Sequence, residues 1–157
     1  MSGSWTNPTT PNLADFTIFV QTSMGIPLSA LSPTSVWIGY AFNRAMDLVL
    51  QVPTVNALEY VLAVYNCGGH ILLKIAPDLP GQTYFVSARA GGNTGFNLVG
   101  FTPGVVSGSS DQGTSQSLTT PEGFKNLTIG DLDFMKTPWG RDYLAYAQDF
   151  GSLWGLS

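Results

Sequence analysis

Residues 77–122 carry too few apolar side chains to build a hydrophobic core of their own. Glycine, proline, serine and threonine dominate this stretch, and Leu118 is the only apolar residue between Ser107 and Thr120. A chain of 157 residues has the length of one domain. We therefore expect one domain, residues 1–157, whose core is built by the parts that flank this segment. Residues 81–122, approximately, should form a projecting arm, either a long β-hairpin or a loop.

Two short runs in this part of the chain have the β-branched and aromatic composition of strands. They are residues 83–87 (TYFVS) and residues 98–101 (LVGF). We expect both runs to be extended.

The part of the chain before the arm predicts three helices. Asn12 is a suitable N-cap for the first, Pro33 stands at the first position of the second, and Pro53 stops it. The helices should run from Leu13 to about Met24, from Ser32–Pro33 to about Gln51, and from near Thr54 to Ile75 or Ala76.

The second helix is apolar around most of its circumference, and Gly39, Asn43 and Asp47 leave only a narrow polar stripe. A helix of this kind should be buried on more than one side.

The third helix has a polar edge and a core face at helical spacing. Its edge comprises Glu59, Asn66, His70 and Lys74, and its core face comprises Leu58, Val61, Leu62, Tyr65, Leu72 and Ile75. Gly68 and Gly69 in its middle indicate either a kink or the close approach of another helix.

Helical order returns near the C-terminal end of the sequence. Thr137–Pro138 is a second cap-plus-proline start signal, and aromatic residues then follow at helical spacing up to Phe150 and Gly151. Residues 152–157 form an apolar tail that should dock into its own core or into a neighbour. The fold class is thus mainly α: a small bundle of residues 13–76 and 137–151, the arm, and the tail.

Charge is scarce along the whole chain. Lys and Arg together number 6 and Asp and Glu 10, which gives a net charge of −4. Six scattered basic residues argue against a protein that holds nucleic acid through its phosphates. So few ionic side chains also suggest that other chains cover much of the surface. We find no signal peptide and no membrane span, and the single cysteine, Cys67, fits synthesis in a reducing compartment.

No residue pattern predicts a catalytic, cofactor or metal site. His70 and Cys67 could share one side of a helix, but a core cysteine beside a boundary histidine explains them better. Helix caps and a solvated helix edge account for the acidic residues near the end of the chain, and flexible turns account for two glycine-rich stretches that resemble phosphate loops. The acidic residues are Asp131, Asp133, Asp142 and Asp149, and the glycine-rich stretches are residues 91–95 and 108–114.

The order of these features resembles the head–tail connector (adaptor) proteins of tailed bacteriophages. The resemblance rests on the helix that follows Ser32, on the glycine-rich stretch 104–110 that leads into a Ser/Thr-rich arm, and on a closing helix with the pattern T-x-[WY]-G-x-x-[YF]. That pattern is filled by Thr137, Trp139, Gly140 and Tyr143. The middle segment here is longer and richer in glycine than in the simplest members of the family.

The resemblance implies a structural virion protein that assembles, usually twelve to a ring, beneath the portal. The ring would join the portal protein to a tail or nozzle protein and extend the DNA exit channel, through which DNA passes without specific binding. The protein would be made in the host cytoplasm and reside in the neck of the virion, with no membrane contact. We expect subunit contacts at Trp37, Tyr40, Phe42, Tyr84 and Phe85, and portal contacts at Leu153, Trp154 and Leu156.

Two other readings stay open. One is a different oligomeric virion protein, such as a head-decoration protein, a tail-fibre-associated protein or a tail terminator, which would form a hexamer. The other is a small hydrolase that uses aspartates, in which alanine at Asp131, Asp133 or His70 would abolish activity.

Overall fold

The computed structural model describes residues 5–91, 95–99, 108–111, 114–117 and 128–149. These residues are mainly α-helical, as the sequence predicts, and they contain six helices and one two-stranded sheet. The elements are α1 (Leu13–Thr22), α2 (Val36–Leu48), α3 (Ala57–Ile75), α4 (Tyr84–Arg89), β1 (Gly108–Asp111), β2 (Thr114–Ser117), α5 (Ile129–Phe134) and α6 (Pro138–Asp149).

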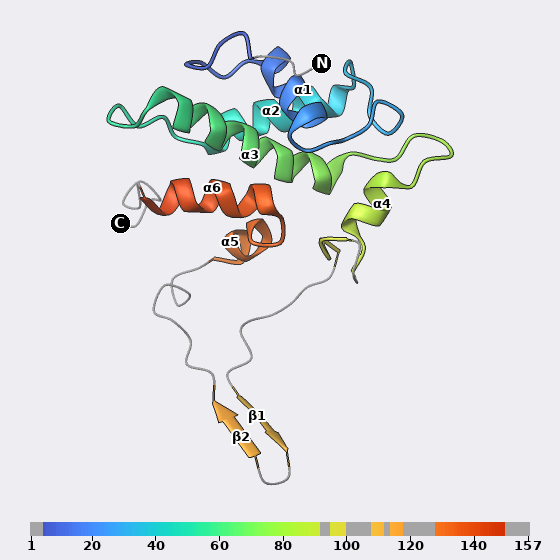
Figure 1. Cartoon of the computed structure of the whole chain (residues 1–157), viewed down its shortest axis with the longest axis vertical. Coiled ribbons are helices and arrows are strands. Elements are labelled where there is room, and N and C mark those ends of the chain that lie inside the picture. Colours follow the sequence, from blue (N-terminus) through green and yellow to red (C-terminus); the bar gives the residue numbers. More distant parts are fainter. Residues whose placement is uncertain (1–4, 92–94, 100–107, 112–113, 118–127, 150–157) are drawn as a thin grey trace.

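The helices form layers around α3, the longest of them (Figure 1). Helices α1 and α2 lie on one side of α3, and α5 and α6 lie on the other. Most of α3 is buried as a result, on both of its flanks. The fully buried residues with the largest side chains are Tyr65, Phe16, Phe85, Ile38, Leu72, Leu73 and His70.

The helix starts follow their capping residues. The Asn12 side chain accepts the N–H of Asp15 at 2.8 Å, which confirms it as the N-cap of α1. Helix α2 starts one turn later than predicted, because the hydroxyl of Ser35 is its cap and residues 32–35 form a preceding turn. Helix α3 likewise starts at Ala57, after the Asn56 cap, and ends where predicted.

The glycine pair in α3 marks a close approach of other helices. A Cβ atom on Gly68 would lie 2.9 Å from the Phe16 ring of α1 and 3.5 Å from the Ala41 carbonyl of α2. A Cβ on Gly69 would lie 2.8 Å from the sulfur of Met24. Of the two alternatives, the glycine pair therefore indicates close helix packing: a Cβ on Gly68 would press on the buried Phe16 ring, and one on Gly69 would displace the end of the Met24 side chain.

Residues 84–87 are helical, and the prediction of a strand over residues 83–87 is wrong. The Asp78 carboxylate accepts the N–H groups of Phe85 and Val86 at 2.7 and 2.8 Å, which satisfies donors in the first turn of α4. The Arg89 guanidinium donates to the carbonyl of Ala76 at 2.7 Å and to that of Leu73 at 3.2 Å, so it also ties α4 to the end of α3. These contacts override the β-forming composition of the segment.

The structure contradicts three further expectations about which residues are buried. Helix α2 buries only one face, made by Ile38, Ala41 and Ala45. In α3, His70 is 1% exposed and belongs to the core, whereas Leu58 is 42% exposed. His70 is buried because α6 packs against the side of α3 on which it lies, with Thr137 2.8 Å from its ring.

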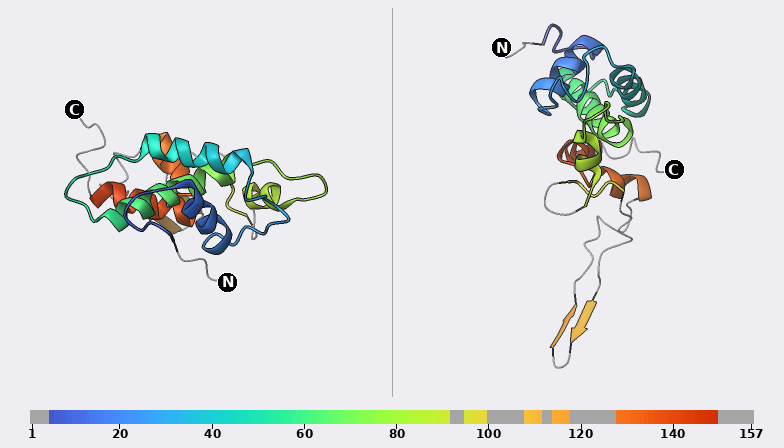
Figure 2. Two further views of the ribbon diagram at one scale, coloured as in Figure 1. Left: turned by 90° about the horizontal axis from the view of Figure 1, so that it is seen from above. Right: turned by 90° about the vertical axis from the view of Figure 1, so that its right-hand side faces the viewer.

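Strands β1 and β2 pair antiparallel, with Gly108 opposite Ser117 and Asp111 opposite Thr114. In both figures the two strands lie apart from the helices (Figures 1 and 2). Of the other predicted strand, Leu98 and Val99 are in a bend and residues 100–101 lie outside the described part.

Candidate functional site

The outer face of α2 carries two of the predicted interface residues. Trp37 and Tyr40 are 37% and 56% exposed, and their rings meet edge to face with centroids 6.5 Å apart. Arg44 and Leu48 continue the same flank at helical spacing, and both are exposed. We call Trp37, Tyr40, Arg44 and Leu48 the α2 outer face. Tryptophan, tyrosine and arginine are the residues that contribute most to protein–protein binding.

The other three predicted interface residues are turned toward their own chain. Phe85 is 0% exposed, so it has no surface to offer a neighbour. Phe42 is half-buried and packs on the Phe16 ring at 5.7 Å, and Tyr84 is half-buried beside Phe85. The predicted portal-docking residues Leu153, Trp154 and Leu156 lie outside the described residues.

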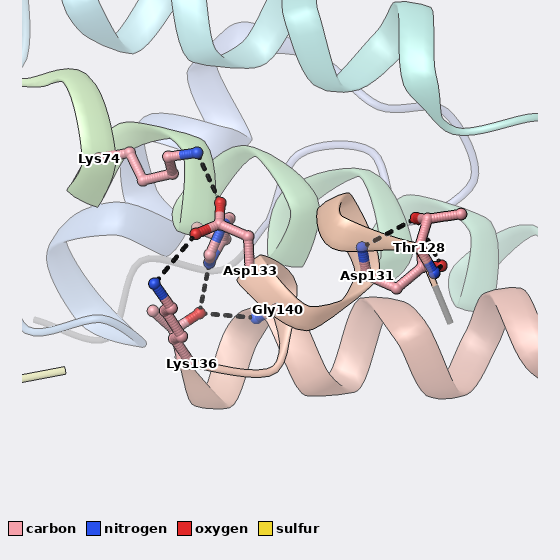
Figure 3. Close-up of polar contacts among 8 residues, drawn as sticks. Lys74, Thr128, Asp131, Asp133, Lys136 and Gly140 are labelled. Atoms are coloured by element: carbon pink, nitrogen blue, oxygen red, sulfur yellow. Dashed lines mark hydrogen bonds and ion pairs between the residues drawn. The ribbon is translucent and has the colours of Figure 1, made fainter. Parts of the chain in front are cut away.

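A second group of residues, which we call the polar junction, lies where α5 and α6 meet α3. Its members are His70 and Lys74 of α3, Asp133 of α5, and Lys136, Thr137 and Gly140 of the α5–α6 turn and the start of α6 (Figure 3). The Thr137 hydroxyl oxygen lies 2.8 Å from Nδ1 of His70 and accepts the Gly140 N–H at 2.9 Å. Thr137 is thus the N-cap of α6, as its sequence predicts, and also the bond between α6 and α3.

The hydrogen bonds of the junction define the tautomer of His70. The ionised Asp133 carboxylate beside Nε2 can only accept a hydrogen bond, so Nδ1 of His70 is left to accept the hydroxyl proton of Thr137. The proton of the neutral ring then resides on Nε2, 3.4 Å from the Asp133 carboxylate that accepts it. Burial lowers the pKa of His70 to about 4, although the nearby Asp133 raises it in part. The ring is therefore neutral at pH 7.

Asp133 forms the ion pairs of the junction. Figure 3 shows Lys74 and Lys136 directed at its carboxylate, and the N–O distances are 2.5 and 3.6 Å. Desolvation by burial raises the pKa of Asp133, but the interactions with Lys74 and His70 together outweigh it, so that the pKa is lowered. Asp133 consequently stays ionised and holds α5 to α3.

Aromatic rings enclose this junction. The Phe134 ring lies 4.6 Å from His70 and 4.9 Å from Tyr143, centroid to centroid. A Cβ on Gly140 would lie 1.9 Å from the Phe134 carbonyl oxygen, so no other residue fits at this position in the first turn of α6. Trp139 packs outside it on the Phe96 ring at 5.8 Å. Each residue of the T-x-W-G-x-x-Y pattern thus contributes to packing.

His70 is poorly placed to act as a catalytic acid or base. His70 is 1% and Thr137 0% exposed, and both side chains are engaged in joining helices. Cys67 is buried as expected, and burial raises the pKa of its thiol to about 12, although Arg44 lowers it in part. A thiol of this kind is a poor nucleophile.

The acidic residues of α5 have structural partners. The Asp131 carboxylate accepts the N–H of Thr128, whose hydroxyl in turn accepts the Asp131 N–H, which makes a capping box (Figure 3). Among the described residues, no group of three or more His, Cys, Asp or Glu side chains could hold a metal ion. The sequence interpretation of Asp131 as a cap agrees with this geometry, but α5 itself and the ion pairs of Asp133 were not foreseen.

Comparisons of the chain with protein-family models, with curated proteins and with solved structures gave no match. Across the described residues, no helix is both long and apolar enough to cross a bilayer.

Proposed function

We propose that this chain is a structural protein that associates with copies of itself through the α2 outer face. The observation that supports this most is the placement of Trp37 and Tyr40, whose rings lie together on the surface of a helix rather than in the core. A stable fold gains nothing from exposing these rings, whereas an interface gains large, rigid contact areas. The low charge of the chain agrees with surfaces that other chains cover.

We propose further that the assembly is a ring of twelve in the neck of a tailed bacteriophage, where it joins the portal to a tail or nozzle protein. The predicted arm of about residues 81–122 is too long at its start, because Tyr84–Arg89 form α4 and Phe85 is buried in the bundle. A small bundle with a shorter Gly/Ser/Thr-rich arm agrees with a mainly α-helical fold whose two strands lie apart from the helices. Such an arm could add its strands to a neighbour's sheet edge. The net charge of −4 suits a channel from which DNA is repelled rather than bound.

The first test is the mass of the purified protein in solution. A ring of twelve supports the adaptor, a ring of six favours a tail terminator, and a monomer both alone and in the presence of a portal ring contradicts the proposal. Removal of residues 152–157 should leave the fold intact and abolish attachment to the portal ring.

The second test places a charge on the α2 outer face. Tyr40→Glu should reduce the assembled fraction while the helical circular dichroism remains unchanged, because a carboxylate cannot be desolvated in the interface. Ala14→Glu is the matched control: Ala14 is exposed in the first turn of α1, where a negative charge is favourable. Equal assembly of both variants would contradict the role of this face.

A further inference from the structure

Exposed leucines flank the connection between the end of α2 and the start of α3. Leu48, Leu50 and Leu58 are 37%, 57% and 42% exposed, and they stand within eleven residues of one another around the α2–α3 connection. Helix α6 reaches this same end of the bundle, since the hydroxyl of Tyr146 donates to the carbonyl of Leu50 at 3.4 Å. We call Leu48, Leu50, Leu58 and Tyr146 the corner patch.

The chain leaves α6 beside this patch. The last residue of α6 is Asp149, three positions after Tyr146, and both figures show the end of α6 next to the α2–α3 connection (Figures 1 and 2). Three residues of helix correspond to about 4.5 Å of rise. The residues that follow, 150–157, can reach about 26 Å when extended.

The composition of residues 150–157 matches an apolar docking site. Their sequence is FGSLWGLS, which has no charged residue and includes Phe150, Leu153, Trp154 and Leu156. Exposed together in water, these side chains would carry an apolar area that soluble proteins normally cover. The corner patch offers exposed apolar side chains at the end of the bundle where α6 stops.

We propose that residues 150–157 dock onto the corner patch of their own chain. A second copy could offer the same residues, but a short tether gives the chain's own segment an effective concentration of the order of millimolar. At micromolar protein the intramolecular contact therefore prevails. This inference does not depend on the proposed assembly, and a partner that takes up residues 150–157 would have to displace them from the patch.

Disulfide trapping tests this contact. We expect the double variant Leu50→Cys, Leu153→Cys to form a disulfide within one chain under mild oxidation, with loss of two hydrogens from the intact monomer mass. Cys67 will not compete, because it is buried and its thiol pKa is raised to about 12. The control pairs Leu153→Cys with Leu28→Cys, because Leu28 is 63% exposed but precedes the opposite end of α2.

Trapping at position 50 should be at least about tenfold faster than at position 28, as expected for a docked rather than a free segment. Equal rates at the two positions, or a product with the mass of two chains, would overturn the proposal. Because the product is identified by mass under denaturing conditions, the result is independent of whether the protein is a monomer or a ring. Failure of the docking proposal is thus distinguishable from failure of the proposed function.

Discussion

The hydroxyl of Thr137 and Nδ1 of His70 lie 2.8 Å apart although 67 residues separate them in the chain. Both side chains are buried, and through Gly140 and Asp133 their hydrogen bonds join three helices. A buried polar group that loses its partner costs more free energy than the bond itself contributes. We therefore expect the free energy of unfolding to fall when a single hydrogen-bonding group of the polar junction is removed.

The first prediction concerns the Thr137 hydroxyl. Thr137→Val should lower the free energy of unfolding by about 1–3 kcal/mol, because the Gly140 N–H and His70 Nδ1 lose their partner while the volume is kept. Thr137→Ser retains the hydroxyl and should cost only about 1 kcal/mol for the missing methyl. Urea unfolding measures both. A valine variant as stable as the wild type would show that the hydroxyl contributes nothing.

The second prediction concerns pH. The pKa of His70 is lowered from 6.5 to about 4 in the folded protein, chiefly by burial. Below pH 6.5 the unfolded chain takes up a proton that the folded chain does not, so stability is complete above pH 6.5 and decreases toward pH 4. The full loss amounts to about 3 kcal/mol. The charged groups that face the ring are Lys74, Lys136 and Asp133, and Asp133 stays ionised over this range because its own pKa is lowered.

Since His70 is the only histidine, its ring protons give a single NMR titration that reports this pKa directly. His70→Asn should remove most of the pH dependence of unfolding between pH 6.5 and 5, whatever its stability at pH 7. A ring that titrates at or above pH 6.5 would contradict the buried, neutral state.

Much of the fold follows from local sequence signals. Asn12 and Thr137 cap helices that the sequence predicts, and Gly68 marks a helix contact because a Cβ there would press on a buried ring of α1. Helix α4 could not be predicted in this way. Tyr84 and Phe85 favour a strand locally, and the Asp78 carboxylate that stabilises the helix lies outside the segment.

The candidate sites were less predictable than the fold. No residue near His70 in the sequence indicates that Thr137 will hydrogen-bond to its ring. Helical spacing alone therefore assigned His70 to the polar edge of the third helix. Phe85 and Tyr40 are both aromatic residues in apolar surroundings, yet the first is 0% and the second 56% exposed. Which of them faces solvent depends on how the helices pack, and sequence composition does not specify that.

A third prediction compares two helical glycines. Gly140→Ala should destabilise the protein by about 3 kcal/mol, because the new methyl would overlap the Phe134 carbonyl and force α5 and α6 apart. Gly39→Ala should instead stabilise it by about 1 kcal/mol, since nothing lies within 4 Å of a Cβ there and alanine favours the helix. Thermal unfolding of the two variants measures the contrast. A tolerated alanine at position 140 would mean that the α5–α6 turn lies elsewhere.

The last prediction concerns Asp15, which is 0% exposed and holds the N-terminal segment onto α1. Its carboxylate accepts the N–H groups of Thr6 and Asn7, each at 2.8 Å, the Thr6 hydroxyl at 2.9 Å and the Asn12 amide at 2.8 Å. Burial raises the pKa of Asp15, but these hydrogen bonds outweigh it and lower the pKa to about 2. The ionised carboxylate therefore contributes stability above pH 3.8 that is lost as the pH falls toward 2.

Asp15→Asn should lower the free energy of unfolding at pH 7 by about 2 kcal/mol, because an amide nitrogen would face donors that need an acceptor. Thr6→Ala removes one of the donors and should cost about 1 kcal/mol or less. The wild-type advantage over Asp15→Asn should also shrink between pH 5 and pH 2, measured by urea unfolding at each pH. Faster hydrogen exchange at Thr6 and Asn7 in Asp15→Asn would locate the effect at the N-terminal segment. Unchanged exchange there, with unchanged stability, would show that the carboxylate does not hold it.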